Sequence, residues 1–213
     1  MIRAVFGTGG FGREVMPLLM RDDIGKSQLL FVEDKPTAAF CNGVRVRSTH
    51  EFMQLPVQST IAIAVANAED RRQIAKRVLG GICEPDDIIA GNVVSYFPHE
   101  IGPGAIICAF TSIHPNVKIG EQFHANIYSY VAHDCEIGDF VTFAPRVNCN
   151  GGIKIGDGVY IGTGAVLRDH IEIGAGAVIG MGSVVTKSVP PGAVVYGNPA
   201  KIIRMVKVNT WIK

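Results

Sequence analysis

The feature that most constrains the fold is a six-residue period over residues 101–190. A period of six matches neither an α-helix nor a simple alternating strand, because each unit must contain one short strand and one corner. The repeat therefore predicts a parallel β-helix in which three units close one coil. An apolar or small residue occupies every sixth position: Ile101, Ile107, Ile113, Ile119, Ala125, Val131, Ile137, Phe143, Cys149, Ile155, Ile161, Leu167, Ile173, Ile179 and Val185.

Because the register is unbroken, the spacing between two residues in the sequence predicts their separation along the axis of the β-helix. Fifteen units make five coils, and residues eighteen apart are expected to stack in neighbouring coils about 4.8 Å apart. Ile-Gly-x-Gly sequences at 161–164, 173–176 and 179–182 are expected at corners, because residues other than Gly or Asn are strained at positive φ. An antiparallel sheet protein with accidental spacing is the alternative, and the strictness of the repeat argues against it.

Composition excludes several classes of protein. The 213 residues are 47% apolar with a net charge of +1, which is typical of a soluble globular protein and argues against nucleic-acid or membrane-surface partners. No apolar run reaches the roughly 18 residues that cross a bilayer, and the first residues lack a signal-peptide pattern, so we expect a cytoplasmic protein. The five cysteines contain no CxxC pair, and Cys135 and Cys149 fall on inward positions where they are expected to be buried.

The N-terminal stretch predicts a nucleotide site. Residues 3–6 predict a short strand, and Gly7-Thr8-Gly9-Gly10-Phe11-Gly12 follows it and opens a helical pattern. Gly7, Gly9, Gly10 and Gly12 would let a diphosphate approach backbone amides at the helix N-terminus. A second strand over 29–32 precedes Glu33 and Asp34, where an acidic group is expected to bind a ribose hydroxyl or a base. A tight turn without a ligand is the alternative.

The predicted first domain covers residues 1–86. A helix over 50–55, a strand over 60–66 and a helix over 68–79 complete a small βαβ domain. This is the first half of a dinucleotide-binding fold, so a nucleotide-linked substrate fits better than NAD, and a dehydrogenase is disfavoured. The β-helix domain is expected over 87–213, although Ile89 and Val93 fit an initial incomplete turn. Pro190-Pro191-Gly192 breaks the repeat, and an apolar tail ending at Trp211 is expected to cap the open end.

The order of these features resembles one family. The glycine-rich half-domain, the hexapeptides, His133-Asp134-Cys135 and the Gly-Asn-Pro-Ala-Lys motif ending at Lys201 are together similar to bacterial sugar acyltransferases, which include UDP-4-amino-sugar N-acetyltransferases and sialic acid O-acetyltransferases. The resemblance covers the whole chain. It implies a left-handed parallel β-helix, a homotrimer with active sites between subunits, acetyl-CoA as co-substrate, a nucleotide-linked amino sugar on the N-terminal domain, and no metal.

The resemblance also implies site residues. His133 is expected to be the general base, a role that imidazole suits at neutral pH, and Asp134 is expected to orient it. Neighbouring residues on a flat strand face apart, so this pairing requires a corner or a bulge. Gly151, eighteen residues after His133, is expected to stack on the base and to donate its amide to the thioester oxygen. Asn126 matches another polar residue that lines the site.

The remaining expected contacts concern acetyl-CoA. Thr142 stands where some relatives carry a second histidine. The cofactor is expected to contact Gly151, Gly152, Thr163, Met181 and Lys201.

Three functions are compatible with these residues. The leading hypothesis is direct acetyl transfer to a UDP-linked 4-amino-4,6-dideoxy sugar in bacterial glycan biosynthesis, without an acyl-enzyme. O-acetylation of a sialic acid or another sugar hydroxyl is the alternative within the family. A catalytically silent nucleotide-binding trimer is the alternative from another class.

Overall fold

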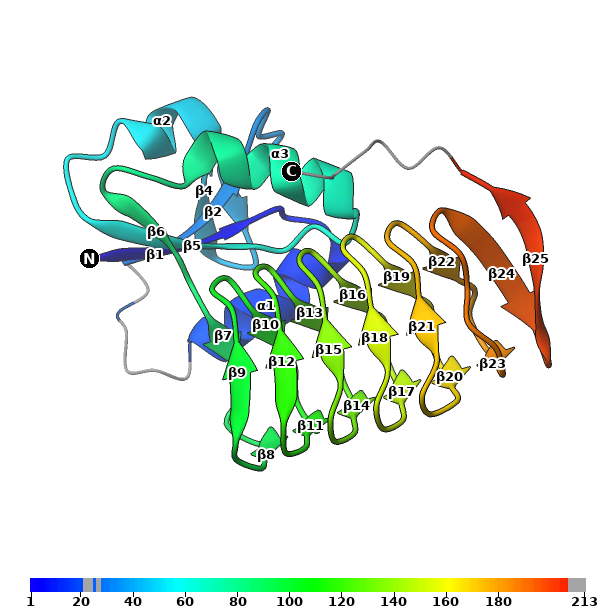
Figure 1. Cartoon of the computed structure of the whole chain (residues 1–213). Helices are drawn as coiled ribbons and strands as arrows, with labels where there is room; N and C mark the ends of the chain where they lie inside the picture. Colours follow the sequence, from blue (N-terminus) through cyan, green and yellow to red (C-terminus); the bar gives the residue numbers. More distant parts are fainter. Residues whose placement is uncertain (21–24, 26–27, 207–213) are drawn as a thin grey trace. The chain divides into compact units, whose positions relative to one another are not determined.

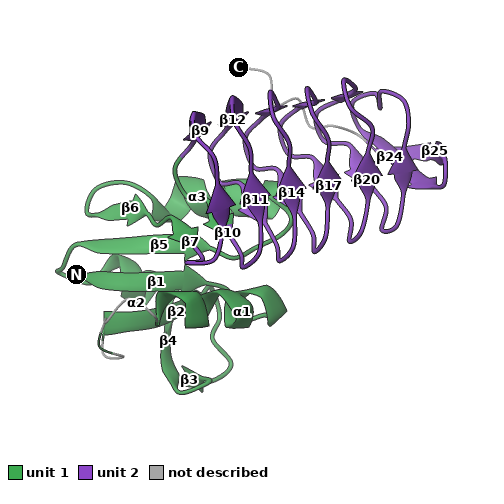
Figure 2. Cartoon of the chain, turned by 90° about the horizontal axis from the view of Figure 1, so that it is seen from below, with its two compact units in different colours: residues 1–88, 103–106 green, residues 89–102, 107–213 purple. Residues whose placement is uncertain are grey.

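The computed structural model describes residues 1–20, 25 and 28–206 (Figure 1). Within that part of the chain, no helix combines the length and the hydropathy needed to cross a bilayer. Trp211, the expected end of the terminal cap, lies outside the described residues. The chain divides into two compact units (Figure 2), which are Met1–Ile88 with Pro103–Ile106, and Ile89–Gly102 with Ile107–Lys213.

Among the described residues, the first unit is a six-stranded sheet with three helices. Its order is β3-β4-β2-β1-β5-β6, and only β3 runs antiparallel to its neighbour among the described pairings. The two central strands are mainly apolar, with residues 4–6 and 29–32 buried, as expected where helices cover a parallel sheet. The strands are β1 (Ile2–Phe6), β2 (Leu29–Glu33), β3 (Phe40–Cys41), β4 (Val44–Ser48), β5 (Ser59–Ile63) and β6 (Cys83–Pro85); the helices are α1 (Gly10–Leu19), α2 (Thr49–Met53) and α3 (Ala68–Val78).

The three helices begin in different ways. Ser48 and Glu51 form a capping box at α2, and the Asn67 side chain accepts a hydrogen bond from the Asp70 amide at α3. Both arrangements satisfy amide groups that have no partner inside the helix. By contrast, α1 begins after Gly9 without a side-chain cap. No side chain therefore caps the N-terminus of α1, and helix N-termini of this kind are sites where anions bind.

The second unit is the parallel β-helix that the hexapeptide period predicts. Its coils have three sides. Side one contains β7 (Ile88–Ile89), β10 (Ile106–Ile107), β13 (His124–Ala125), β16 (Thr142–Phe143), β19 (Tyr160–Ile161), β22 (Val178–Ile179), β24 (Ala193–Gly197) and β25 (Ala200–Met205). Side two contains β8 (Val94–Ser95), β11 (Ser112–Ile113), β14 (Tyr130–Val131), β17 (Asn148–Cys149), β20 (Val166–Leu167) and β23 (Val184–Val185). Side three contains β9 (His99–Ile101), β12 (Val117–Ile119), β15 (Glu136–Ile137), β18 (Lys154–Ile155) and β21 (Glu172–Ile173).

Strands of neighbouring coils pair in a register of eighteen residues, as predicted. Ser112 pairs with Tyr130, and Tyr130 pairs with Asn148. Inward positions are closed to solvent, since Val131, Phe143 and Ile161 are each 0% exposed. After Pro190 the spacing shortens, and Val178 pairs with Val194. The strand that follows, β25, runs antiparallel to β24 and ends side one.

Every sixth residue adopts positive φ at a corner. The glycines of the Ile-Gly-x-Gly sequences do so at Gly164, Gly176 and Gly182. Residues other than glycine also adopt positive φ at these corners, at a typical cost of about 1 kcal/mol each. The coil geometry therefore imposes this conformation whatever residue the sequence supplies. The non-glycine residues in the series are Phe110, Asn116, Gln122, Tyr128, Asp134, Phe140, Arg146 and His170.

A column of alternating charges runs along side three. Lys118 is in register with Glu100 and with Glu136, and Lys154 is in register with Glu136 and with Glu172. The Lys154 Nζ atom lies 3.7 Å from Glu136 Oε1. These side chains line a groove of about 930 Å³ that contains none of the residues predicted for catalysis.

Candidate active site

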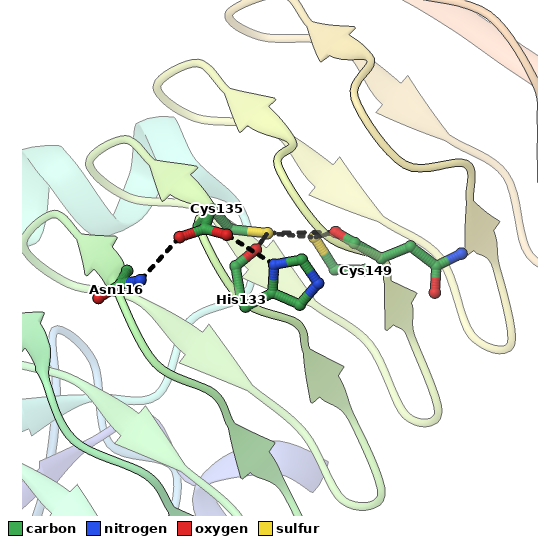
Figure 3. Close-up of polar contacts among 6 residues, drawn as sticks. Asn116, His133, Cys135 and Cys149 are labelled. Atoms are coloured by element: carbon green, nitrogen blue, oxygen red, sulfur yellow. Dashed lines mark hydrogen bonds and ion pairs between the residues drawn. The ribbon is translucent and has the colours of Figure 1, made fainter.

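His133 and Asp134 form a hydrogen-bonded pair at the corner between β14 and β15. Asp134 has a φ of 60°, and this turn brings the two neighbouring side chains to the same side of the chain. His133 Nδ1 lies 2.7 Å from Asp134 Oδ2 (Figure 3). The two side chains are 59% and 54% exposed. A corner of the kind that this pairing requires is therefore present.

The carboxylate of Asp134 is held from its other side by Asn116. Asn116, one coil earlier, donates from Nδ2 to Asp134 Oδ1 at 2.8 Å (Figure 3). Hydrogen bonds from His133 and then from Asn116 hold the pKa of Asp134 below its ordinary value. An ionised carboxylate at Nδ1 favours the tautomer that carries its proton there, which leaves the lone pair on Nε2. His133 is thus arranged to accept a proton through Nε2.

Gly151 stacks directly on the His133 ring. A Cβ atom added to Gly151 would lie 2.7 Å from His133 Cε1 and 2.8 Å from Nε2. Among the described residues, the Gly151 amide donates no backbone hydrogen bond outside a strand. Pro115 occupies the same column two coils earlier, so the coil does not need a donor at this position. The Gly151 amide is thus available to an oxygen beside the imidazole.

Two thiols lie inside the coil beneath this corner. Cys135 and Cys149 are each 0% exposed, and their Sγ atoms are 4.0 Å apart (Figure 3). The hydrogen bond with Cys135, together with complete burial, raises the pKa of the Cys149 thiol. Both residues fill the core, as expected, and neither presents sulfur at the surface where His133 lies.

Other residues of the predicted site lie at a different corner. Asn126, Thr163 and Met181 belong to the corner between sides one and two, which we call the Asn126 corner; it also carries Phe110, Tyr128 and Arg146. Lys201 lies in β25. One full side of a coil, at most about 20 Å long for six residues, separates this corner from His133. Within one chain, the structure does not bring these residues to His133.

The Asn126 corner carries exposed aromatic side chains that sequence reasoning did not identify. The rings of Phe110 and Tyr128 are stacked with centroids 4.9 Å apart, and the Arg146 guanidinium lies 5.6 Å from the Tyr128 centroid. Phe110 is 56% exposed and Tyr128 is 48% exposed. Phe110, Tyr128 and Arg146 are eighteen residues apart in the sequence, and this spacing could have predicted that they stack on neighbouring coils.

The glycine-rich loop of the first unit folds closely against itself at Gly7 and Gly12 and is open at Gly9 and Gly10. Gly7 has a φ of 100°, and its amide donates to Val32 O at 2.9 Å. A Cβ atom on Gly12 would overlap the Gly7 carbonyl oxygen, whereas Gly9 and Gly10 have nothing within 4 Å of theirs. The loop is thus closed on the protein side and open at the uncapped start of α1.

The two acidic residues after β2 already have partners. Glu33 Oε1 accepts hydrogen bonds from the Thr8 amide at 3.0 Å and from the Thr8 hydroxyl. Asp34 accepts hydrogen bonds from Thr49 Oγ1 at 2.7 Å and from Arg77 at 3.0 Å. Although burial acts to raise it, these hydrogen bonds hold the pKa of Asp34 below its ordinary value.

A cavity of about 500 Å³ lies beside Asp34. It is lined by Asp34, Val65, Asp70, Gln73, Ile74 and Arg77. Asp34 and Val65 follow the carboxyl ends of β2 and β5, where ligands bind in parallel sheets. Across the part of the chain that is described, no group of three or more His, Cys, Asp or Glu side chains is placed to hold a metal ion.

Comparisons with known proteins agree with this architecture. A family model described as bacterial transferase hexapeptide (six repeats) matches residues 152–187. A GDP-perosamine N-acetyltransferase of Escherichia coli O157:H7 is 46% identical over 207 residues, which cover 92% of this chain and 94% of that protein. The solved structure of WeeI from Acinetobacter baumannii AYE has a TM-score of 0.90 at 45% identity, with 95% of this chain and 100% of that chain covered.

A second similar structure contains the acetyl donor. It is the acetyltransferase domain of PglB from Neisseria gonorrhoeae FA1090, solved in complex with acetyl coenzyme A. Its TM-score is 0.85 at 29% identity, with 94% of this chain and 98% of that chain covered.

Proposed function

The chain belongs to the hexapeptide-repeat sugar acyltransferases, and from this membership we propose that it transfers acetyl from acetyl-CoA to the amino group of a nucleotide-linked amino sugar. The observation that carries the proposal is the hydrogen-bonded His133 beside the open amide of Gly151. These are the two functions that acetyl transfer to an amine requires, a base for the nucleophile and a donor for the oxyanion.

The proposed reaction is a direct attack on the thioester. His133 Nε2 takes a proton from the amine as the nitrogen bonds to the carbonyl carbon, and the Gly151 amide stabilises the oxyanion. The tetrahedral intermediate then collapses, the carbon–sulfur bond breaks and CoA departs. Burial of Cys135 and Cys149 supports a route without an acyl-enzyme.

The comparisons favour a different nucleotide from the one expected from the sequence. UDP was expected from the sequence, whereas the relative that is 46% identical is named for GDP-perosamine, whose sugar is a 4-amino-4,6-dideoxy sugar. We therefore propose a GDP-linked 4-amino-4,6-dideoxy sugar. Guanine presents an amino group and a ring N–H on one edge, and an ionised carboxylate such as Asp34 accepts two hydrogen bonds side by side. Uracil presents only one donor.

The test is the release of free CoA thiol from acetyl-CoA with GDP-, UDP- and dTDP-linked 4-amino sugars and with free sialic acid. We expect turnover with the GDP-linked sugar, and a loss of preference for GDP over UDP in Asp34→Asn. Preferred turnover of the UDP-linked sugar would reject the guanine assignment alone. Turnover with sialic acid only would replace N-acetylation by O-acetylation, and no turnover with any acceptor would favour a silent scaffold.

We further propose that the active site lies between copies of the chain in a homotrimer. His133 and Asp134 stand on an open corner, with side chains more than half exposed. Asn126, Thr163 and Met181 stand at another corner, and Met181 is 73% exposed. Placing the Asn126 corner of one copy against the His133 corner of the next would enclose the exposed His133 site between two copies. Repeating that contact around a three-sided coil closes a ring.

Mixing two inactive variants tests the shared site. His133→Ala and Asn126→Ala are each expected to be impaired, and trimers that contain both variants should recover about a third of wild-type activity, because one of the three head-to-tail interfaces in each mixed trimer joins two intact residues. Co-expression with two tags, purification of mixed oligomers and an assay of CoA release measure it. Mixed oligomers with only the summed activity of the two variants would place the site within one chain.

A further inference from the structure

His170 is a corner residue with a side chain in a stretch of the coil where the other corner residues are glycines. Its φ of 54° lies in the region that disfavours side chains. The corner residues around it along the coils, at Gly152, Gly158, Gly164 and Gly176, are glycines. At the corners from 152 to 182, His170 is therefore the residue that carries a side chain.

The ring of His170 leans toward the catalytic corner. His170 lies one coil after Gly152, and a Cβ atom on Gly152 would be 2.7 Å from His170 Cε1. From the other direction, the His133 ring lies against Gly151. Two imidazoles on alternate coils therefore converge on the same pair of adjacent glycines. The His170 amide also donates to Gly151 O at 3.0 Å, which ties the two coils together at this step.

The His170 imidazole has no hydrogen-bond partner among the described side chains. The neighbouring carboxylate of Asp169 lies 3.7 Å from Arg168 Nε, and the carboxylate of Asp134 is occupied by His133 and Asn116. Asp134 nevertheless interacts electrostatically with His170. The charged or titratable groups at this corner, from two coils before His170 to one coil after it, are His133, Asp134, Arg168, Asp169 and Lys187.

We propose that His170 is the second imidazole of the acetyl-transfer site and donates a proton to the sulfur of the departing CoA. The inference rests on the proposed function. While His133 gains the proton of the amine, the carbon–sulfur bond breaks, its electron pair stays on sulfur, and sulfur takes a proton from protonated His170. CoA leaves as the thiol. His133 then releases its proton to water and His170 regains one, so the site returns to its starting state.

His170→Gly tests the proposal without straining the corner, because glycine accepts positive φ. With acetyl-CoA we expect kcat to fall about 30-fold, below the usual range for a general acid because a thiolate is already a good leaving group. KM for acetyl-CoA should stay within about twofold, since the imidazole acts on the transition state. The alkaline limb of the pH profile of kcat, which reports the acid, should disappear.

A leaving-group series separates proton donation from a structural role. With the acetyl thioester of an acidic aryl thiol, which departs without protonation, wild type and His170→Gly should react at nearly equal rates. His50→Ala, an exposed histidine of the first unit whose ring lies beside Gln54, is the matched control and should match wild type.

The thioester assays of wild type and His170→Gly distinguish the role of His170 from the proposed function. An equal loss for both thioesters, or no loss for either, would overturn the role of His170 and leave the proposed function intact. Loss in His170→Gly for the CoA thioester alone supports the role. A wild-type protein that releases no CoA with any acceptor would overturn both proposals.

Discussion

Replacing His133 with alanine is expected to lower kcat about 1,000-fold, the middle of the range for loss of a positioned base. The side chain is 59% exposed and makes its side-chain hydrogen bond to Asp134, so the thermal midpoint of unfolding should change little. Substrate KM values should also change little, because the lost interaction belongs to the transition state. Steady-state assays of CoA release, with a thermal melt of the same preparation, measure both quantities.

Asp134→Asn tests whether Asp134 acts through His133. It keeps the size of the side chain but removes the charge that favours the Nδ1–H tautomer of His133, so it should reduce kcat by a smaller factor than His133→Ala. The double variant should be no slower than His133→Ala alone, because Asp134 acts through the imidazole. Additive losses would show that Asp134 contacts substrate independently, and a His133→Ala variant with near wild-type kcat would remove His133 from the mechanism.

Gly151→Ala is expected to lower kcat about 100-fold or more, although it adds a single methyl group. That methyl would lie 2.7 Å from His133 Cε1, so the exposed ring must swing away from its position. A displacement of about 1 Å in a reacting group costs roughly 100-fold in rate. Stability should be nearly unchanged, since Gly151 has an ordinary φ and the obstructing group is a mobile ring.

Gly91→Ala is the matched control for this methyl. Gly91 belongs to the same unit, and a Cβ atom there would have nothing within 4 Å, so the variant should keep wild-type kcat. A Gly151→Ala enzyme with wild-type kcat would show that the ring position seen here is not the reactive one. A large loss of stability instead would make Gly151 a packing residue.

Most of the β-helix could be predicted because coils of equal length convert sequence spacing into spatial register. Prediction was weaker where the spacing changes. The regular six-residue register was predicted from Ile101, and the coil at β7 was expected only as an incomplete turn around Ile89, because the stretch that contains Tyr96 and Phe97 departs from the repeat. Pro191 and Gly192 shorten the last coil, so Val178 pairs with Val194. The occupancy of corners by Asp134 and His170 could not be predicted from residue preferences, since the coil overrides them.

The candidate site was predictable in its parts and not in its arrangement. The spacing between His133 and Gly151 placed them in one column. The same arithmetic places Asn126 in another column, but resemblance grouped it with His133 because a family motif gives the order of residues along the chain and not their positions in space. The hydrogen bonds of Glu33 to Thr8 depend on how a loop closes against a neighbouring strand, and no local pattern encodes that contact.

The alternating column on side three has a consequence for folding. Coils of nearly the same shape permit a particular error, in which a strand docks on the coil after next and the intervening coil is left as a loop. That error would set Glu100 against Glu136 and Lys118 against Lys154, and like charges directly opposite each other destabilise strand pairing. The correct order sets each lysine between two glutamates. The column therefore favours the assembly of coils in sequence order, with none skipped.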